Sequence, residues 1–286
     1  MKTIVITGAT SGIGFAAAKA LAATGAYVIG VGRTTKTCED AKALLLKAVP
    51  DANIEFVSGD LSRQSDVNAV ADRILDLIKP QGGLLDVLIN NAGGIRNGYT
   101  TTADGYEMQF ALNHLAGFLL TYRLYPALKR AGGRVIMTGS NSHKMMRMHW
   151  CDVMYAKHYS CLMAYKQSKL CNMLFAREIN RRFGGSGIRA YVVDPGLVNT
   201  NIGNKQTSGI VNAFWSLRKK RGDSPEFVAH TYVYLSNQMP LPKGLYYHDC
   251  KEVPYSRQAD DEQDAAWLFE LSERLCGVKF DGGEEA

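Results

Sequence analysis

Residues 2–23 read KTIVITGATSGIGFAAAKALAA, and this stretch contains a strand, a glycine-rich turn and a helix in direct succession. The β-branched run from Lys2 to Thr7 has the pattern of a buried strand. The alanine-rich run from Phe15 to Ala23 predicts a helix, which ends at Gly25. A strand that enters a helix through a glycine turn is typical of nucleotide-binding α/β sheets.

Short apolar runs and helical periods alternate along the rest of the chain in the same way. Further strands are expected at 27–31, 54–57, 84–89, 134–138, 188–193 and 244–248. Further helices are expected at 40–48, 65–78, 104–129, 164–183, 210–220, 225–235 and 258–275, and the last should turn Trp267, Leu268 and Leu271 inward. Strands that alternate with helices at this spacing need crossover connections, which place helices on both faces of a parallel sheet. The sequence therefore predicts an α/β fold with one doubly wound parallel sheet, in a single domain that spans residues 1–286.

Composition and charge describe an ordinary globular protein. Of the 286 residues, 46% are hydrophobic and 21% are charged, which allows a large core. The formal net charge of +6 suits an anionic small-molecule ligand. The basic run 218–221 is short and lacks interleaved aromatic residues, so it favours a solvated helix end over a nucleic-acid interface.

The cysteines and the hydropathy pattern bear on the compartment. The six cysteines are scattered, with no C-x-x-C pair and no Cys/His cluster at zinc spacing. They are expected to be reduced thiols, as in a reducing compartment. No apolar run approaches the ~20 residues that cross a bilayer, and charged Lys2 is followed at once by a short strand rather than a signal peptide. We expect a cytoplasmic protein with no metal, no membrane span and no nucleic-acid partner.

The glycines that follow the first strand point to a nucleotide. Ligands of doubly wound sheets bind beyond the carboxyl ends of the strands. Gly8, Gly12 and Gly14 lie there, where missing side chains let backbone N–H groups approach a pyrophosphate at the helix N-terminus. A glycine turn that only packs the helix on the strand is the alternative. The turn is expected to bind a dinucleotide through Gly8, Thr10, Ser11, Gly12, Ile13 and Gly14.

The end of the second strand distinguishes between the two nicotinamide cofactors. An acidic residue there would accept hydrogen bonds from the ribose 2′-hydroxyl and repel a 2′-phosphate. This chain has Arg33 and Thr34 instead, with Lys36 nearby and no carboxylate before Glu39. Arg33 can form two hydrogen bonds with a phosphate and Thr34 can add a donor, so the sequence predicts NADP(H). The alternative is that Arg33 is only an exposed charge at a strand end.

Asp60 and Leu61 end the third strand at the same edge of the predicted sheet. The Asp60 carboxylate can accept a hydrogen bond from an adenine amino group, with the Leu61 backbone beside it. Aspartate also forms turns by bonding to its own backbone two residues on, so an Asx turn or a helix cap is the alternative for Asp60.

Tyr165 and Lys169 stand four positions apart in the expected helix 164–183, which places them one turn apart on one face. A free tyrosine titrates near ~10 and exchanges its proton poorly at neutral pH. A fixed positive charge beside the phenol favours the phenolate and lowers the pKa. By itself the pair also fits an amphipathic surface turn, so its meaning depends on the motifs around it.

Taken in order, these motifs carry a family pattern. They are Thr7-Gly-x-x-x-Gly-x-Gly14, Asp60, Asn90-Asn91-Ala92-Gly93, Asn113, Ser140, Tyr165-x-x-x-Lys169 and Pro195-Gly196. Over nearly its whole length the chain resembles the short-chain dehydrogenase/reductase family, which implies a Rossmann fold and nicotinamide-dependent oxidoreduction. Asn113-His114-Leu115 and the long gap between Ser140 and Tyr165 are typical of the retinol dehydrogenase-like branch. Residues 165–182 are also similar to the light-dependent protochlorophyllide reductases.

Two departures from the family pattern affect these expectations. Gly139 stands where many members have a first serine, so Ser140 is the expected active-site hydroxyl and Ser142 is its rival. We also expect no membrane anchor of the kind found on many retinol dehydrogenases, which weakens a retinoid assignment.

The resemblance implies a role for each matching side chain. Tyr165 would be the acid in carbonyl reduction and the base in alcohol oxidation, and Lys169 would lower its pKa and bind the nicotinamide ribose. Ser140 would hold the substrate oxygen, and Asn113 would hold a water that links Lys169 to solvent. The alternatives are a cap role for Ser140, a backbone-pairing role for Asn113 and a plain turn at 195–196. The cofactor would also contact Asn90, Ala92, Gly93, Tyr165, Lys169, Pro195, Gly196, Val198 and Thr200.

Two segments bear on the substrate. The insertion 144–164 is rich in methionine and aromatic residues, which suits an adaptable apolar pocket, a loop with its own small core or a subunit contact. Residues 203–221 form an amphipathic segment that fits a small helical lid over the site or the surface of a homo-oligomer. The sequence leaves these alternatives open.

The sequence as a whole predicts an NADP(H)-dependent enzyme that interconverts an apolar carbonyl compound and its alcohol, with a steroid, retinoid-like or aromatic substrate. One alternative is reduction of an activated C=C bond. Another is a nucleotide-binding sensor that has kept the fold and lost turnover. The presence of Asn113, Ser140, Tyr165 and Lys169 together speaks against the sensor.

Overall fold

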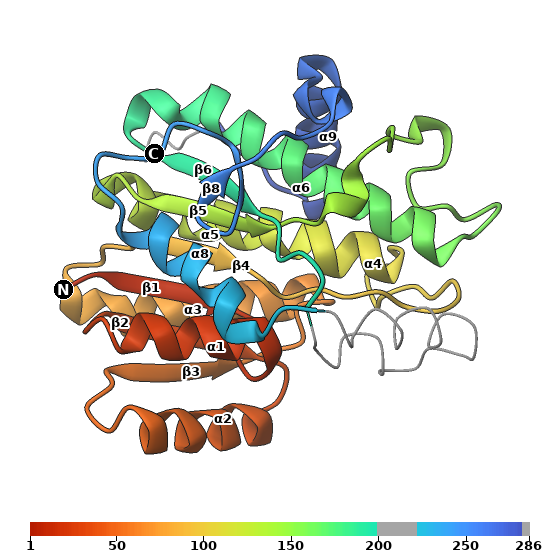
Figure 1. Cartoon of the computed structure of the whole chain (residues 1–286). Coiled ribbons are helices and arrows are strands. Elements are labelled where there is room, and N and C mark those ends of the chain that lie inside the picture. Colours follow the sequence, from red (N-terminus) through yellow and green to blue (C-terminus); the bar gives the residue numbers. More distant parts are fainter. Residues whose placement is uncertain (199–221, 282–286) are drawn as a thin grey trace.

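Eight strands form one sheet in the order β3-β2-β1-β4-β5-β6-β7-β8 (Figure 1). The computed structural model describes residues 1–198 and 222–281. The strand bounds are β1 Thr3–Thr7, β2 Tyr27–Gly32, β3 Ile54–Ser58, β4 Val87–Asn90, β5 Arg134–Thr138, β6 Arg189–Val193, β7 Tyr246–His248 and β8 Lys251–Glu252. Strands β1 to β7 run parallel, and β8 pairs antiparallel with β7. The predicted doubly wound sheet is confirmed, and its winding reverses between β1 and β4, where such sheets bind ligands.

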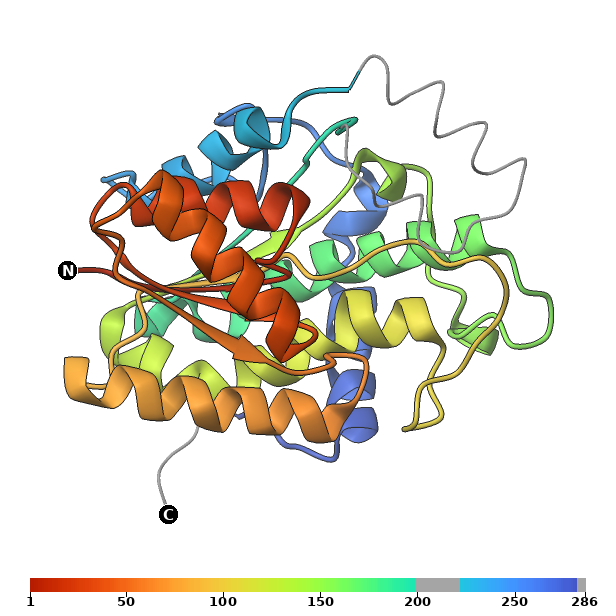
Figure 2. The same cartoon turned by 90° about the horizontal axis from the view of Figure 1, so that it is seen from below.

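Helices cover both faces of the sheet. Their bounds are α1 Gly12–Ala22, α2 Thr35–Ala48, α3 Gln64–Ile78, α4 Met108–Phe110, α5 Ala116–Ala131, α6 Cys161–Phe183, α8 Pro225–Asn237 and α9 Glu262–Cys276. Figure 2 shows the sheet between a layer with α1, α2 and α8 and a layer with α3 and α5. Helix α6 lies against β5 and β6, and α9 packs against α6.

The core lies on both sides of the central strand β1. Ile4 and Ile6 point into the apolar cluster under α1 and α8, while Val5 points into the larger cluster under α3, α5 and α6. All three side chains are fully buried. Successive side chains of a strand face opposite sides of the sheet, so a strand covered on both faces is apolar throughout. This explains why the run from Lys2 to Thr7 shows no polar alternation.

The predicted strands are all present, with small changes at their ends. Strand β4 begins at Val87, three residues later than expected, and β7 begins at Tyr246 rather than at 244. The sequence did not predict β8, because its two residues, Lys251 and Glu252, are both exposed and have no apolar pattern.

Two helices differ most from their predicted form. Helix α2 begins five residues early, because the Thr34 hydroxyl caps it by accepting a hydrogen bond from the Thr37 backbone N–H at 3.3 Å. The helix expected over 104–129 is broken into α4, a π-helical turn over Ala111–Leu115, and α5. A π-helical turn inside a helix is often found at a functional site, and this one carries Asn113.

The prediction that Trp267 of the last helix points inward is wrong. Trp267 is 49% exposed, and its ring meets Trp150 edge to face with a centroid distance of 5.7 Å. Leu268 is buried and Leu271 is partly buried, in agreement with the expected inward face of α9.

The proposed lid at 203–221 and the short helix expected at 210–220 lie outside the described residues.

Candidate active site

The glycine turn between β1 and α1 adopts a backbone conformation that requires glycine. Gly8 and Gly12 have φ angles of +68° and +55°, in the left-handed region that favours glycine. A Cβ at Gly14 would lie 2.2 Å from the Gly8 carbonyl oxygen, so no side chain fits there. Helix α1 starts at Gly12, and the Ser11 side chain makes no capping hydrogen bond to it. Its first N–H groups are thus left without a side-chain cap, which suits a phosphate.

Thr7 and Asn91 join the glycine turn to the end of β4. The Thr7 hydroxyl accepts hydrogen bonds from the backbone N–H groups of Asn91 and Ala92, both at 2.9 Å. The Asn91 amide donates to the Thr7 carbonyl at 2.9 Å. Asn90 points away, toward α5, where its amide donates to the Thr121 hydroxyl at 3.1 Å. Both Thr7 and Asn91 stand in the quoted motifs, but their shared role depends on a contact 84 residues apart along the chain.

Arg33 directly follows β2, and its side chain is exposed. No described residue forms a hydrogen bond or an ion pair with its guanidinium, whereas Lys36 pairs with Asp40 at 3.1 Å. The Thr34 hydroxyl oxygen accepts the cap hydrogen bond from the Thr37 N–H, which leaves its own O–H able to donate, so its contact with a phosphate stays a prediction. The strand end therefore offers one unpaired cation and suits a 2′-phosphate through Arg33.

Asp60 forms the Asx turn that was its alternative interpretation. One carboxylate oxygen accepts hydrogen bonds from the Ser62 backbone N–H at 3.1 Å and from the Ser62 hydroxyl at 2.8 Å. No described residue donates to its other carboxylate oxygen, so the adenine contact of Asp60 and Leu61 stays a prediction.

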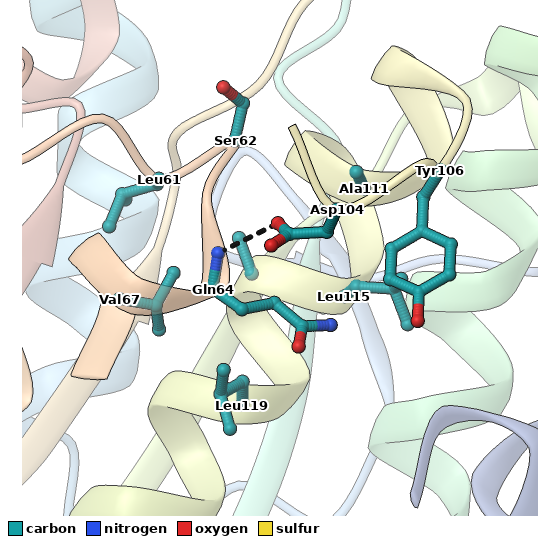
Figure 3. A pocket seen from close by; sticks show the side chains of 10 residues that line it. Leu61, Ser62, Gln64, Val67, Asp104, Tyr106, Ala111, Leu115 and Leu119 are labelled. Carbon is teal, nitrogen blue, oxygen red and sulfur yellow. Dashed lines mark hydrogen bonds between the residues drawn. The ribbon is translucent and has the colours of Figure 1, made fainter. Parts of the chain in front are cut away.

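A small pocket borders this loop but is not the catalytic centre (Figure 3). Leu61 lines one side, and the Gln64 backbone N–H donates to the Asp104 carboxylate at 2.9 Å. The Tyr106 hydroxyl donates to the Leu275 carbonyl at the end of α9 at 2.8 Å. The pocket therefore marks a junction between the start of α3, the segment before α4 and the end of α9, and none of the four catalytic candidates lines it.

Lys169 lies on α6 one turn after Tyr165, with its ammonium 5.6 Å from the centroid of the Tyr165 ring. The ammonium is buried and donates to the Thr138 carbonyl, at the end of β5, at 2.9 Å. Burial lowers the pKa of Lys169 to about 8, and the nearby Asp194 carboxylate opposes this shift. The predicted spacing thus brings Tyr165 and Lys169 together. The Lys169 ammonium is also hydrogen-bonded to the end of β5.

The predicted lowering of the Tyr165 pKa by Lys169 is wrong for this arrangement. Burial raises the pKa of Tyr165 to about 12, a hydrogen bond with the Ser140 side chain opposes this, and Asp194 raises it further. Asp194 is a buried carboxylate that the sequence reasoning missed, although it stands directly before the Pro195-Gly196 motif. Tyr165 is therefore a protonated phenol at neutral pH.

Ser140 combines two of the roles considered for it. Its side chain accepts a hydrogen bond from the Ser142 backbone N–H at 3.2 Å, as a cap would, and also bonds to Tyr165. The rival Ser142 has a buried hydroxyl with no partner among the described residues. The preceding residue must be glycine, since a Cβ at Gly139 would lie 2.6 Å from the Val192 side chain.

Asn113 lies in the π-helical turn and uses its side chain on the backbone of a loop. Its amide oxygen accepts from the Gly94 N–H at 2.8 Å, and its amide nitrogen donates to the Gly94 carbonyl at 3.0 Å. The same nitrogen donates to the Ser168 hydroxyl on α6 at 2.9 Å. Asn113 thereby joins the loop after β4 to the helix that carries Tyr165, and its water-holding role stays a prediction.

The segment after β6 closes the same edge of the sheet. Gly196 has a φ angle of +66°, and its N–H donates to the Asp194 carboxylate at 2.9 Å. A Cβ at Gly196 would lie 2.9 Å from the His248 ring. Val198 pairs with Asp223 in a short bridge, and Thr200 lies outside the described residues.

The insertion 144–164 is held to the protein by several anchors. Met146 and Met148 are buried in the main core rather than lining a free pocket, while Met145 is 87% exposed. Gln167 on α6 accepts from the His149 N–H at 2.8 Å and donates to the Val153 carbonyl at 2.7 Å. The loop therefore packs largely on the protein's own core.

The far end of the insertion is tied to the start of α4. The Tyr159 hydroxyl donates to the buried Glu107 carboxylate at 2.9 Å and accepts from the Gln109 amide at 2.7 Å. Burial raises the pKa of Glu107, while its hydrogen bonds oppose that shift. Figure 1 shows this loop beyond the carboxyl ends of the strands.

Burial of Lys169 has a measurable effect on stability. Its pKa is about 8 in the folded chain against an ordinary value of 10.5, so between these pH values the unfolded chain binds more protons. Stability should therefore rise with pH through this window and be flat with respect to Lys169 below it. Between pH 8 and 10.5, the free energy of unfolding of the wild type should rise by up to about 3 kcal/mol relative to that of Lys169→Met. Urea unfolding at several pH values measures this difference. A difference that stays constant from pH 8 to 10.5 would show that Lys169 is not desolvated.

Other predicted features concern metals, membranes and thiols. Within residues 1–198 and 222–281, no three His, Cys, Asp or Glu side chains gather as metal ligands would. No helix in these ranges combines the length and the apolar character needed to cross a bilayer. All six cysteines are free thiols.

Comparison with known proteins places this site in a family. A family model described as short chain dehydrogenase matches residues 2–210. Retinol dehydrogenase 12 from Mus musculus is 34% identical over 283 residues, which cover 98% of this chain and 88% of that protein.

Solved structures agree with this match. The crystal structure of an uncharacterised protein from Mycobacterium paratuberculosis has a TM-score of 0.78 at 32% identity, and the match covers 98% of this chain and 95% of that one. An alcohol dehydrogenase from Thermococcus sibiricus, solved with 5-hydroxy-NADP, has a TM-score of 0.66 at 20% identity, with 89% and 99% covered, and at this identity shares the fold alone. The chain belongs to the short-chain dehydrogenase/reductase family and is an oxidoreductase of its retinol dehydrogenase-like branch.

Proposed function

We propose that the protein interconverts an apolar carbonyl compound and its alcohol with NADP(H), with Tyr165 as the acid and base. The observation that carries this proposal is the meeting of Ser140, Tyr165 and Lys169 at the carboxyl end of β5, the strand next to the point where the winding reverses between β1 and β4. A sensor without turnover has no need of this set of side chains.

The residues at the nucleotide end fit a nicotinamide dinucleotide phosphate. The side-chain-free cradle of Gly8 and Gly14 and the uncapped start of α1 suit its pyrophosphate, and the unpaired Arg33 suits its 2′-phosphate. Pro195 and Gly196 would lie against its nicotinamide amide, together with Val198 and Thr200. Bound there, the cofactor would supply or accept the hydride.

The side chains of this chain supply the proton and the polarisation. Burial keeps Tyr165 protonated at neutral pH, so its phenol can give a proton to a substrate oxygen during reduction. The Ser140 hydroxyl, bonded to the same phenol, can stabilise charge that develops on that oxygen. The Lys169 ammonium, 5.6 Å from the ring centroid, offsets the negative charge that Tyr165 acquires.

Replacement of Arg33 by Ala tests the cofactor assignment. Loss of a charge-assisted pair of hydrogen bonds removes about 1.5–3 kcal/mol, so the Kd for NADPH should rise by about 10- to 100-fold while that for NADH changes little. The two Kd values are measured by nicotinamide fluorescence. Lys36→Ala is the matched control, because Lys36 is a nearby exposed cation that already pairs with Asp40. Tighter binding of NADH than of NADPH by the wild type would contradict the assignment.

A substrate panel tests the reaction itself. We expect NADPH oxidation, followed by nicotinamide absorbance, with apolar ketones and aldehydes, and the reverse reaction with secondary alcohols, including retinoid-like and steroid compounds. Turnover of enones at the C=C bond without turnover of any ketone would replace the proposal by the C=C reductase. NADPH binding without turnover of any compound would favour the sensor.

The setting of this reaction is part of the proposal. We infer that the enzyme acts in the cytoplasm, which the six unpaired thiols support because a reducing compartment keeps thiols free. Fractionation of cells with an antibody against the protein tests this, and recovery in a membrane pellet that resists high salt would contradict it.

A further inference from the structure

A buried polar network lies behind Lys169, and the proposed mechanism does not use it. The Thr138 carbonyl accepts two hydrogen bonds, from the Lys169 ammonium at 2.9 Å and from the Asn172 amide at 3.1 Å. Asn172 follows Lys169 by three positions on α6, so both side chains reach the same strand end. Asn172 is 1% exposed, and burying an amide is unfavourable unless its polar atoms are paired.

His114 continues the network on the other side of Asn172. It lies fully buried in the π-helical turn, directly after Asn113, and its side chain lies close to that of Asn172. The His114 Nδ1 and the Asn172 Oδ1 are both buried, and neither has a hydrogen-bond partner among the described residues, so each is available to the other when the side chains shift. The His114 Nε2 lies 2.8 Å from the Ser272 hydroxyl on α9. A row of neighbouring polar side chains thus runs from Ser272 on α9 through His114 and Asn172 to the Thr138 carbonyl.

We propose that Asn172, backed by His114, is a positioning residue for Lys169, because it keeps the Thr138 carbonyl hydrogen-bonded when the ammonium turns toward the cofactor. This inference rests on the proposed function, in which Lys169 binds the nicotinamide ribose. The ammonium is held by Thr138 in the structure, so it must exchange this contact for another. A buried carbonyl that lost its only donor would oppose the exchange. With Asn172 as a second donor, the carbonyl keeps one hydrogen bond throughout.

The position of Thr138 also affects Ser140, two residues further along the chain. The Thr138 hydroxyl lies 2.7 Å from the Tyr232 hydroxyl of α8, so Thr138 is held from both faces of the sheet. A shift of the Thr138 carbonyl would therefore move both the partner of Lys169 and the start of the segment that carries Ser140.

The network holds Lys169 without adding a competing charge. Burial lowers the pKa of His114 to about 3, so the imidazole is neutral at working pH, and the Asn172 amide does not titrate. The titratable groups around Lys169 in the described part of the chain are Tyr165 on the same helix, Asp194 after β6, and the neutral His114 behind Asn172. The variants proposed for Asn172, His114 and Asn180 leave the charges of Lys169 and Asp194 in place.

Asn172→Leu removes the amide and keeps the number and branching of the side-chain heavy atoms. The Kd for NADPH, measured by nicotinamide fluorescence, should rise about five-fold, and kcat with the best ketone of the panel should fall about ten-fold. The matched control is Asn180→Leu, because Asn180 also lies on α6 and makes two hydrogen bonds, both of 2.8 Å, with the Ala190 backbone of a neighbouring strand. The control should lower the Tm at least as much and leave both the Kd and kcat near their wild-type values.

His114→Phe provides a second variant in case Asn172→Leu does not fold. Phenylalanine fits the ring cluster around His114, which contains Phe110, Phe118 and Phe175, and it removes only the ring nitrogens. We expect the Kd for NADPH to rise about three-fold. The proposal is overturned if the variants at 114 and 172 bind NADPH as tightly as the wild type, or if Asn180→Leu weakens binding equally. Absence of ketone turnover in the wild type would instead overturn the proposed function, because the binding comparison needs no substrate.

Discussion

Replacing Tyr165 with Phe is expected to lower kcat/KM for carbonyl reduction by about 10³-fold, within the range that general acid catalysis contributes. The ring and its packing remain, and only the hydroxyl that bonds to Ser140 is lost. The substrate oxygen then has no acid beside it, and the polarisation by Ser140 and Lys169 accounts for the residual rate. The effect should appear in kcat, because Tyr165 acts on charge that develops in the transition state.

The control for this variant is Tyr191→Phe. Tyr191 is a buried tyrosine in the cluster under α1 and α8, and its hydroxyl donates to the Pro242 carbonyl at 3.0 Å. Its loss should cost some stability and leave kcat/KM within about two-fold of the wild type. The Kd for NADPH should stay within about three-fold for both variants, measured by fluorescence titration. If Tyr165→Phe turned over ketones at the wild-type rate, Tyr165 would not be the acid.

Gly14→Ala is expected to destabilise the fold by about 3 kcal/mol and to abolish nucleotide binding. A Cβ there would lie 2.2 Å from the Gly8 carbonyl oxygen and 2.5 Å from the Asn91 amide nitrogen. The first contact is with backbone, so it is relieved only if the turn opens or α1 moves away from β1. On intrinsic propensity alone, alanine in a helix would stabilise by about 1 kcal/mol, so the sign of the result is diagnostic.

The free energy of unfolding in urea and the NADPH titration measure the two parts of this prediction. Gly185→Ala is the control, because a Cβ at Gly185 would meet no atom within 4 Å and this residue lies just past the end of α6. It should stay within about 0.5 kcal/mol of the wild type. A Gly14→Ala protein as stable as the wild type would mean that the glycine is needed only for approach to the nucleotide and not for the packing of α1.

Local patterns in the sequence were sufficient for the sheet and for the position of most candidate site residues. Buried parallel strands are continuous apolar runs, so the sequence shows where each strand ends. The glycine turn, Asp60 and Ser140 follow such strand ends. Because strands that alternate with helices run parallel, these residues lie at one edge of the sheet. The spacing of Tyr165 and Lys169 placed them on one helix face because that distance depends only on helix geometry. The capped start of α2 and the π-helical turn at Asn113 were missed, because a cap and an extra residue per turn leave little trace in hydrophobic periodicity.

The electrostatic state of the site was decided by the tertiary structure. The pKa of Tyr165 is raised rather than lowered, because burial of the phenol and the nearby Asp194 outweigh the hydrogen bond from Ser140. Lys169 is bound to the Thr138 carbonyl, which a helix-face argument could not show.

The sequence by itself therefore determined the fold, the family and the pairing of Tyr165 with Lys169, all of which follow from short-range spacing and strand order. The tertiary structure alone decided which groups share the Thr138 carbonyl, why His114 is neutral and how Asn172 stands behind Lys169. These features depend on burial and on contacts between β5, α6, the π-helical turn and α9, which lie far apart along the chain. Desolvation and hydrogen bonding act through space, so no local pattern reports them.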